Sequence, residues 1–116
     1  MNASHAMAKP NENGVFNTRT LAAHGVYLTN RDMSILARRG VSVAHNPVSN
    51  LKLASGIANV TAMLKSGVNV SLGTDGCASN NSHDLFEELK LAALLAKGTS
   101  LDPTAVPAYS ALKLAT

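Results

Sequence analysis

Three apolar segments of strand length recur along the chain, and each is followed by a longer segment whose apolar residues have helical spacing. The predicted strands cover residues 20–24, 41–45 and 68–73. Helices are predicted over residues 30–39, 57–66 and 83–97, and a glycine closes each of them, namely Gly40, Gly67 and Gly98. Strands and helices that alternate with tight connections predict parallel strands joined by right-handed crossovers. The expected fold class is therefore α/β, either part of a β/α barrel or an open sheet.

The segments outside these elements are polar or rich in turn-forming residues. Residues 1–17 contain several asparagines together with a proline and a glycine, so we expect a loop or arm there. Two further loops are expected over residues 46–56 and 74–83. The predicted domain organisation is a polar arm over 1–19 followed by the α/β part over 20–116.

Capping signals and apolar spacing refine the predicted helices. Thr29 followed three residues later by Asp32 is typical of a capping box at a helix start. Pro103 is expected in a first helical turn, and Pro107 is expected to start a last short helix. On the helix predicted over 83–97, the face expected to be buried consists of Leu85, Phe86, Leu89, Ala92, Ala93 and Ala96.

Composition limits the classes of protein to which the chain can belong. Its 116 residues suffice for one small domain, and 46% hydrophobic with 15% charged residues is typical of a globular chain. Aromatic residues make up 3% and the net charge of +3 comes from scattered Lys and Arg, so we expect no nucleic-acid partner. No apolar stretch approaches the ~18 residues of a membrane-spanning helix, so no membrane partner is expected. The single cysteine, Cys77, excludes an intrachain disulfide and suits a cytoplasmic location.

A polar side chain stands at the end of each predicted strand. His24 ends the first, His45 ends the second, and Asp75 follows the third between two glycines. Because parallel strands place their carboxyl ends on one face, these side chains are expected to converge there. Two imidazoles and a carboxylate can bind a divalent metal or move protons around a water that the metal activates. The alternative is structural: each histidine as a hydrogen-bonding residue, the aspartate as a helix cap, and Cys77 without a chemical role.

Three segments of the sequence are more specific than the pattern of polar residues at the strand ends. The segments AAHGVYLT (22–29), VAHNPVSNLKLASGIA (43–58) and SLGTDGCASNNSHDLFEELKLAALL (71–95) closely resemble the amidohydrolase superfamily. The best match is the branch of S-adenosylhomocysteine and 5-methylthioadenosine deaminases, guanine deaminases and triazine chlorohydrolases. The resemblance covers residues 20–116 and implies a partial (β/α)8 TIM barrel, about strands 6 to 8 with their helices.

The resemblance also implies roles for individual residues in a metal-dependent deaminase that acts on a purine nucleoside or related heterocycle. Asp75 would be a ligand of zinc or iron and would accept a proton from the water that the metal activates. His24 would polarise the attacked centre or relay protons. His45 would line the substrate pocket, and Ser79 and Asn80, with the neighbouring Asn81, would belong to the loop that braces it.

The sequence departs from the family in ways that limit what this chain can do alone. It has no HxH pair and no HxxE segment, which supply the family's other metal ligands and a proton-handling glutamate. We therefore expect a C-terminal part of the barrel that is inactive alone, holds no metal tightly and forms a homo-oligomer. The alternatives are a non-catalytic half-barrel that self-associates, or a piece of a triazine chlorohydrolase or guanine deaminase.

Overall fold

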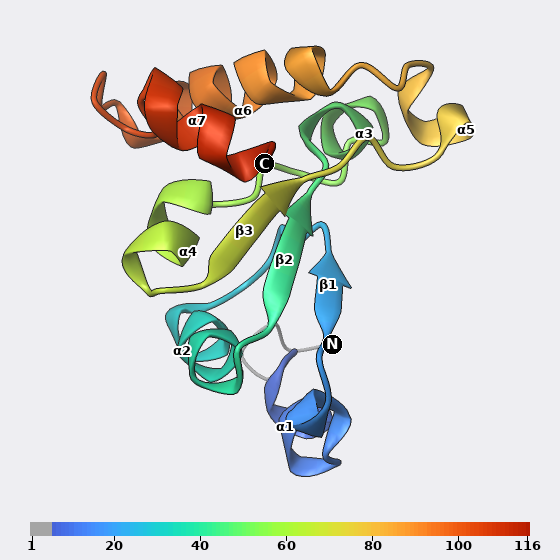
Figure 1. Ribbon diagram of the computed structural model, residues 1–116, viewed down its shortest axis with the longest axis vertical. Helices are drawn as coiled ribbons and strands as arrows, with labels where there is room; N and C mark the ends of the chain where they lie inside the picture. Colours follow the sequence, from blue (N-terminus) through green and yellow to red (C-terminus); the bar gives the residue numbers. More distant parts are fainter. Residues whose placement is uncertain (1–5) are drawn as a thin grey trace.

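Three short parallel strands form the sheet of the computed structural model, which describes residues 6–116 (Figure 1). The strands are β1 (Leu21–Ala23), β2 (Ser42–His45) and β3 (Asn69–Leu72), and they lie in the order β1-β2-β3. Leu21 pairs with Ser42, and Ser42 pairs with Asn69. Each strand therefore lies beside its neighbour in the sequence, which confirms the predicted parallel α/β arrangement.

Helices connect the strands and follow them. The longer ones are α2 (Asn30–Arg39), α4 (Val60–Lys65), α6 (Leu85–Ser100) and α7 (Ala108–Leu114). The shorter ones are α1 (Ala8–Glu12), the 3-10 helix η2 (Val15–Asn17), α3 (Pro47–Lys52) and α5 (Cys77–Asn80). In Figure 1, α3 lies near the arrowheads of β2 and β3, at the carboxyl ends of the strands, and α5 lies farther out, beyond α3. No described helix is long and apolar enough to cross a membrane.

Helix α2 begins and ends where its sequence predicts. The Thr29 hydroxyl accepts from the amide of Asp32, and the Asp32 carboxylate accepts from the amide of Thr29, which forms the expected capping box. Gly40 ends the helix with φ 65°, a left-handed conformation that a side chain disfavours. Pro107 likewise precedes α7 at its N-cap, as expected.

The hydrophobic core lies on one face of the sheet. Val43 of β2 and Val70 of β3 point into it and join Leu36 of α2 and Met63 of α4. The alternate residues of the strands face the other way and are more exposed, and there the Asn69 side chain donates to the Ser42 hydroxyl at 2.9 Å. In a closed barrel this second face would be the inner one.

Two segments expected to be loops contain short helices. Residues 46–56 include α3, and residues 74–83 include α5. Pro47 begins α3 at a position that favours proline, because the N–H of a first-turn residue has no acceptor within the helix and its absence costs no hydrogen bond. Both helices span a turn or two, which is too short for a helical period to be recognised in the sequence.

Several predicted helix boundaries were wrong. Helix α4 begins at Val60 rather than at residue 57, because the side chain of Asn59 caps it. Helix α6 continues through Gly98 to Ser100 and ends at Leu101, which has φ 54°. Pro103 lies in turns and not in a helix.

The N-terminal arm is folded where the structure describes it. Residues 1–5 of the expected loop lie outside the described part, but α1 and η2 replace the rest of it. Ala8 and Phe16 join the hydrophobic core, and the Met7 amide donates to the buried Asp32 carboxylate at 2.9 Å. The boundary between residues 19 and 20 stays a prediction.

The buried face of α6 also differs from the prediction. Phe86 is 80% exposed, although it was expected to point inward. Glu88 takes a buried place instead, in line with Ala92 and Ala96 one and two turns later. The rest of the predicted face is largely confirmed, because Ala92 and Ala96 are buried and Leu89 and Ala93 pack against the core.

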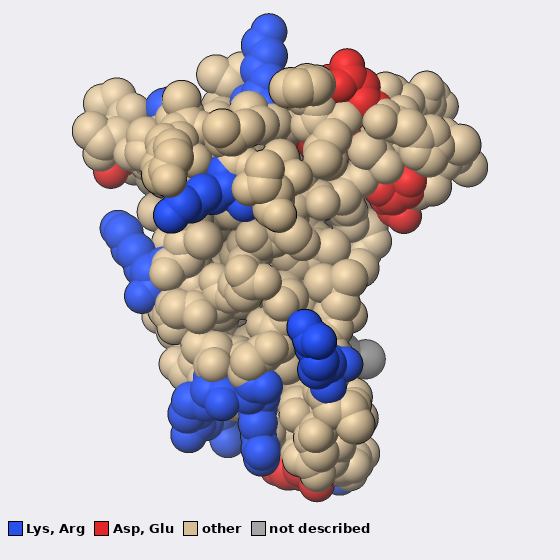
Figure 2. Space-filling view, viewed as in Figure 1, with Lys and Arg blue, Asp and Glu red and all other residues tan. Residues whose placement is uncertain are grey.

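Charged residues are dispersed over the face of the molecule shown in Figure 2. In Figure 2, Lys and Arg side chains form separate groups, and Asp and Glu lie between and beyond them. This distribution agrees with the scattered basic residues of the sequence, and the absence of a nucleic-acid partner stays a prediction.

Candidate functional site

The backbone turns sharply where two of the strands end. His24 directly follows β1 with φ 70°, and Asp75 follows β3 with φ 60°. Neither is a glycine, and a residue with a side chain adopts this left-handed conformation at a cost of about 1–3 kcal/mol. The two turns bring the imidazole Nε2 of His24 to 3.8 Å from the carboxylate Oδ2 of Asp75. The structure thus brings together the two residues that the sequence singled out for catalysis.

Hydrogen bonds hold the carboxylate of Asp75 in its charged form. The Ser49 hydroxyl donates to its Oδ2 atom at 2.6 Å. This bond is the main cause of a lowered pKa for Asp75, and the Gly76 amide, the Ser79 hydroxyl and the nearby His24 contribute less. The side chain is 33% exposed, so an ion or a small molecule can reach it.

Two amide side chains surround the other ring nitrogen of His24. Its Nδ1 atom lies 2.8 Å from Oδ1 of Asn50 and 3.4 Å from Nδ2 of Asn46. Both asparagines are buried, whereas the imidazole is partly exposed. The ring is therefore held from inside the protein at Nδ1 and presents Nε2 to Asp75.

His45 occupies a different environment. It lies on the same side of β2 as Val43 and is 1% exposed. Burial lowers the pKa of His45 to about 4, so the imidazole is neutral at pH 7. Among the described residues no hydrogen bond joins it to His24 or Asp75, and its Nδ1 has no partner. The structure thus places His45 inside the chain rather than on an open pocket wall, and its role in substrate binding stays a prediction.

Ser79 and Asn80 brace the loop that carries Asp75. The Asn80 side-chain amide donates to the carbonyl of Thr74 at 2.7 Å, and the Ser79 hydroxyl donates to the carbonyl of Gly76 at 3.0 Å. Thr74 and Gly76 are the residues on either side of Asp75 in the chain. The contacts support a bracing role, while contact with substrate stays a prediction.

Sequence reasoning missed Glu88, a buried carboxylate that links the segment after β2 to the segment after β3. Glu88 accepts from the backbone amide of Val48 at 3.2 Å and from the side chain of Asn80 at 2.5 Å. It is fully buried, and loss of water raises the pKa of Glu88 above its ordinary value. Its position one turn before Ala92, on the apolar face of α6, was the signal available in the sequence.

Ser49 and Asn50 were missed as well, although both lie in the HNPVSNLKL segment. They were assigned to a loop, whereas they belong to α3, and both side chains are buried. Asn46, just before this helix, lies against Gly73, where an added Cβ would overlap its Oδ1 atom. Gly73 therefore leaves room for the Asn46 side chain beside the end of β3.

The donor set of the described residues is too small for a complete zinc site. Zinc in enzymes is held by about three protein ligands drawn from His, Cys, Asp and Glu. Residues 6–116 contain no group of three such side chains arranged to hold a metal ion. Asp75 fits as one ligand, since its carboxylate is charged and accessible.

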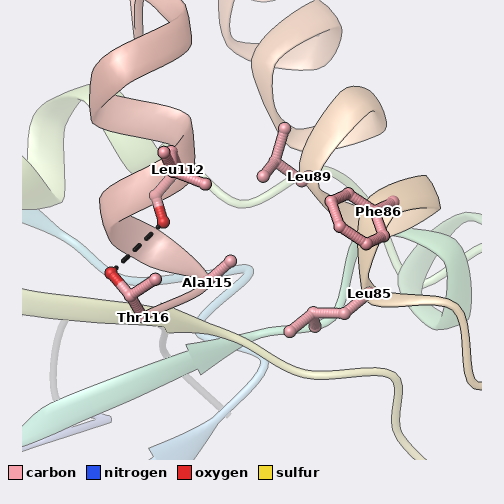
Figure 3. Close-up of a pocket in the computed structure, with 6 residues that line it drawn as sticks. All are labelled: Leu85, Phe86, Leu89, Leu112, Ala115 and Thr116. Carbon is pink, nitrogen blue, oxygen red and sulfur yellow. Dashed lines mark hydrogen bonds between the residues drawn. The ribbon is translucent and has the colours of Figure 1, made fainter.

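A separate apolar hollow lies between α6 and α7 (Figure 3). Its volume is about 170 Å³, and the residues that line it are Leu85, Phe86, Leu89, Leu112, Ala115 and Thr116. None of these six side chains is titratable.

Comparisons with known proteins agree with the geometry. The model of the amidohydrolase family matches residues 3–116. A 5'-deoxyadenosine deaminase of Methanosarcina mazei is 59% identical over 103 residues, which is 89% of this chain and 24% of that protein. A 5-methylthioadenosine/S-adenosylhomocysteine deaminase of Acetivibrio thermocellus is 57% identical over the same shares. The chain thus spans about a quarter of the length of these curated relatives.

A solved structure shows the same arrangement of the backbone. The crystal structure of an adenosine deaminase from Xanthomonas campestris with bound zinc matches with a TM-score of 0.90 and 47% sequence identity. The match covers 94% of this chain and 25% of that one. The family model, the sequence relatives and the fold agree, and the chain belongs to the amidohydrolase family, as a part of its barrel.

Proposed function

We propose that this chain is the C-terminal part of a metal-dependent hydrolase that deaminates a purine nucleoside or a related heterocycle. The observation that carries the proposal is the pair formed by His24 and Asp75, 3.8 Å apart at the carboxyl ends of parallel strands. The relatives support the substrate class, since their names specify deaminases of adenosine-type nucleosides.

Each residue of the pair has a distinct task in the proposed reaction. Asp75 supplies one ligand of zinc or iron, and the other ligands come from outside this chain. A bound divalent ion lowers the pKa of water toward neutrality. The Asp75 carboxylate, kept charged by Ser49, accepts a proton from the attacking water, and Nε2 of His24 moves a proton toward the leaving amine. Ser79, Asn80 and His45 are proposed to hold the walls of the substrate pocket.

The proposal is tested by restoring the missing part of the barrel. We expect the 116-residue chain alone to hold no stoichiometric zinc or iron and to release no ammonia from adenosine-type nucleosides. Co-expressed with the segment of the Methanosarcina mazei relative that precedes the matching region, it is expected to deaminate 5'-deoxyadenosine. In that complex Asp75→Asn is expected to lower kcat by at least about 10²-fold, because a proton acceptor is lost.

The matched control is Asp102→Asn, which changes an acid in the turn after α6 in the same way. Its activity should equal that of the unchanged complex. Equal activity of Asp75→Asn and the unchanged complex would contradict the proposal. Activity on guanine or a chlorotriazine but not on nucleosides would favour the alternative families. A folded complex with no activity would favour the non-catalytic half-barrel.

We also propose that the chain alone self-associates, because β1 and β3 are both edge strands in the described part. Light scattering after size exclusion is expected to give a multiple of the chain mass. Leu21→Lys places a charge on the exposed edge strand β1 and should shift the chain toward monomer. Leu101→Lys, an equal change at an exposed turn, should leave the mass unchanged. A monomer at every concentration would contradict the proposal. The cytoplasmic location stays a prediction.

A further inference from the structure

We propose that Asn50 is a positioning residue that holds the His24 ring with its proton on Nδ1 and its Nε2 lone pair directed at Asp75. This inference rests on the proposed function, in which Nε2 of His24 moves the proton, and it deepens that function by naming the residue that selects the reactive nitrogen.

The two contacts at Nδ1 make different demands on the ring. Oδ1 of Asn50, at 2.8 Å, can only accept, so it requires a proton on Nδ1. Nδ2 of Asn46, at 3.4 Å, can only donate, so it requires a lone pair there. The shorter contact is within the range of a normal hydrogen bond and the longer one is beyond it. Oδ2 of Asp75, at 3.8 Å, is too far from Nε2 to accept a hydrogen bond, so the contact with Asn50 favours the tautomer with its proton on Nδ1.

The backbone around Asn50 fixes the position of its side chain. Asn50 is 2% exposed and belongs to α3. Its amide donates to the carbonyl of Asn46 at 2.9 Å, and its carbonyl accepts from Ser55 at 2.8 Å. Glu88 accepts from the amide of Val48 in the first turn of the same helix. The side-chain oxygen Oδ1 of Asn50 thus points toward His24 from a helix that is held on several sides.

The other half of the Asn50 side chain indicates that it is not there for packing alone. Its Nδ2 atom is buried and has no hydrogen-bond partner among the described residues. A buried donor without a partner destabilises a fold, and leucine would fill a similar volume without this penalty. The compensating contact is the one from Oδ1 to His24.

An uncharged acceptor also suits a proton relay beside a carboxylate. Asn50 holds Nδ1–H without adding a second negative charge next to Asp75. With Nδ1 occupied, the proton must enter and leave the ring at Nε2, which faces Asp75 at 3.8 Å. Proton transfer by His24 is thus confined to Nε2, on the side of the ring that faces Asp75.

The test is the tautomer of His24 in the 116-residue chain, measured by long-range ¹H–¹⁵N NMR after selective ¹⁵N labelling of histidine at pH 8.5. In the unchanged chain we expect a protonated Nδ1 and an unprotonated Nε2 for His24. Asn50→Leu is expected to remove this preference, so that the Nε2–H form becomes the major one. Asn50→Asp keeps an acceptor oxygen and should restore the Nδ1–H signature. Asn69→Ala, which removes an asparagine on the exposed sheet face, is the matched control and should change nothing.

Either of two results overturns the inference. One is an Nε2–H tautomer in the unchanged chain, which needs no variant to fold. The other is an Nδ1–H signature that survives in both Asn50→Leu and Asn50→Ala, of which the alanine variant serves if the leucine variant does not fold. In the reconstituted complex, Asn50→Leu should lower kcat about 10²-fold with KM unchanged. If that complex has no activity, the proposed function fails while the tautomer measurement still decides the role of Asn50.

Discussion

Replacing Glu88 with alanine is expected to lower the free energy of unfolding by about 4 kcal/mol, because one buried and one partly buried donor lose their acceptor and each such loss costs about 1–3 kcal/mol. The donors are the backbone amide of Val48 and the side-chain amide of Asn80. The measurement is urea denaturation followed by circular dichroism at one fixed protein concentration. Glu87→Ala removes the exposed neighbour and is expected to change stability by less than about 0.5 kcal/mol. Equal losses in both variants would show that the buried contacts of Glu88 contribute nothing.

Glu88→Gln separates the charge of this residue from its shape. Burial raises the pKa of Glu88 above its ordinary value of 4.5, so the folded chain binds more protons than the unfolded chain. The stability that Glu88 gains from binding its proton in the folded chain is therefore fully present below pH 4.5. This part of the free energy of unfolding is lost as the pH rises through the pKa of Glu88 in the folded chain. Glutamine does not titrate, so this part of the pH dependence should disappear in the variant. Identical slopes of stability against pH in the two proteins would contradict the raised pKa.

Leu36→Ala is expected to lower the free energy of unfolding by about 2–5 kcal/mol, the usual cost of emptying a fully buried site. Leu36 lies on α2 with no exposed surface, in the same cluster as Val43 of β2 and Met63 of α4. Urea denaturation again provides the measurement. Leu94→Ala on α6 is the matched control, because Leu94 is 55% exposed and its loss leaves little cavity. A similar cost at both positions would mean that the sheet and α2 are not packed as described.

The order and type of the main elements could be predicted because each depends on local signals. Helix α2, for example, is bounded by the capping box of Thr29 and Asp32 and by Gly40. Both signals act within a few residues and do not depend on the rest of the fold. The parallel arrangement followed from the alternation of strands and helices. Gly98 was misleading because a glycine within a helix costs only about 1 kcal/mol, which the packing of α6 against α7 and the sheet can offset.

The candidate site could be predicted only in part. The strand ends pointed to His24 and Asp75, because topology alone gathers strand ends on one face. Their partners Ser49 and Asn50 come from α3, a helix too short to leave a period in the sequence. Glu88 could be understood only once its two donors were known, since an acidic residue on a helix is more often solvated. The burial of His45 likewise depends on which side of β2 the helices cover.

The order β1-β2-β3 has a consequence for how this part of the protein can form during synthesis. Each strand pairs with the one translated before it, so no strand has to wait for a partner from the far end of the chain. A growing chain that leaves the ribosome from its N-terminus can therefore add one strand and its helix at a time to a sheet already begun. Asp75 comes on the last of these units, so its contacts with His24 and Ser49 close only after all three strands have emerged. The pair of His24 and Asp75 would thus form only once β3 has emerged, and the contacts of Glu88 on α6 with Val48 and Asn80 would follow.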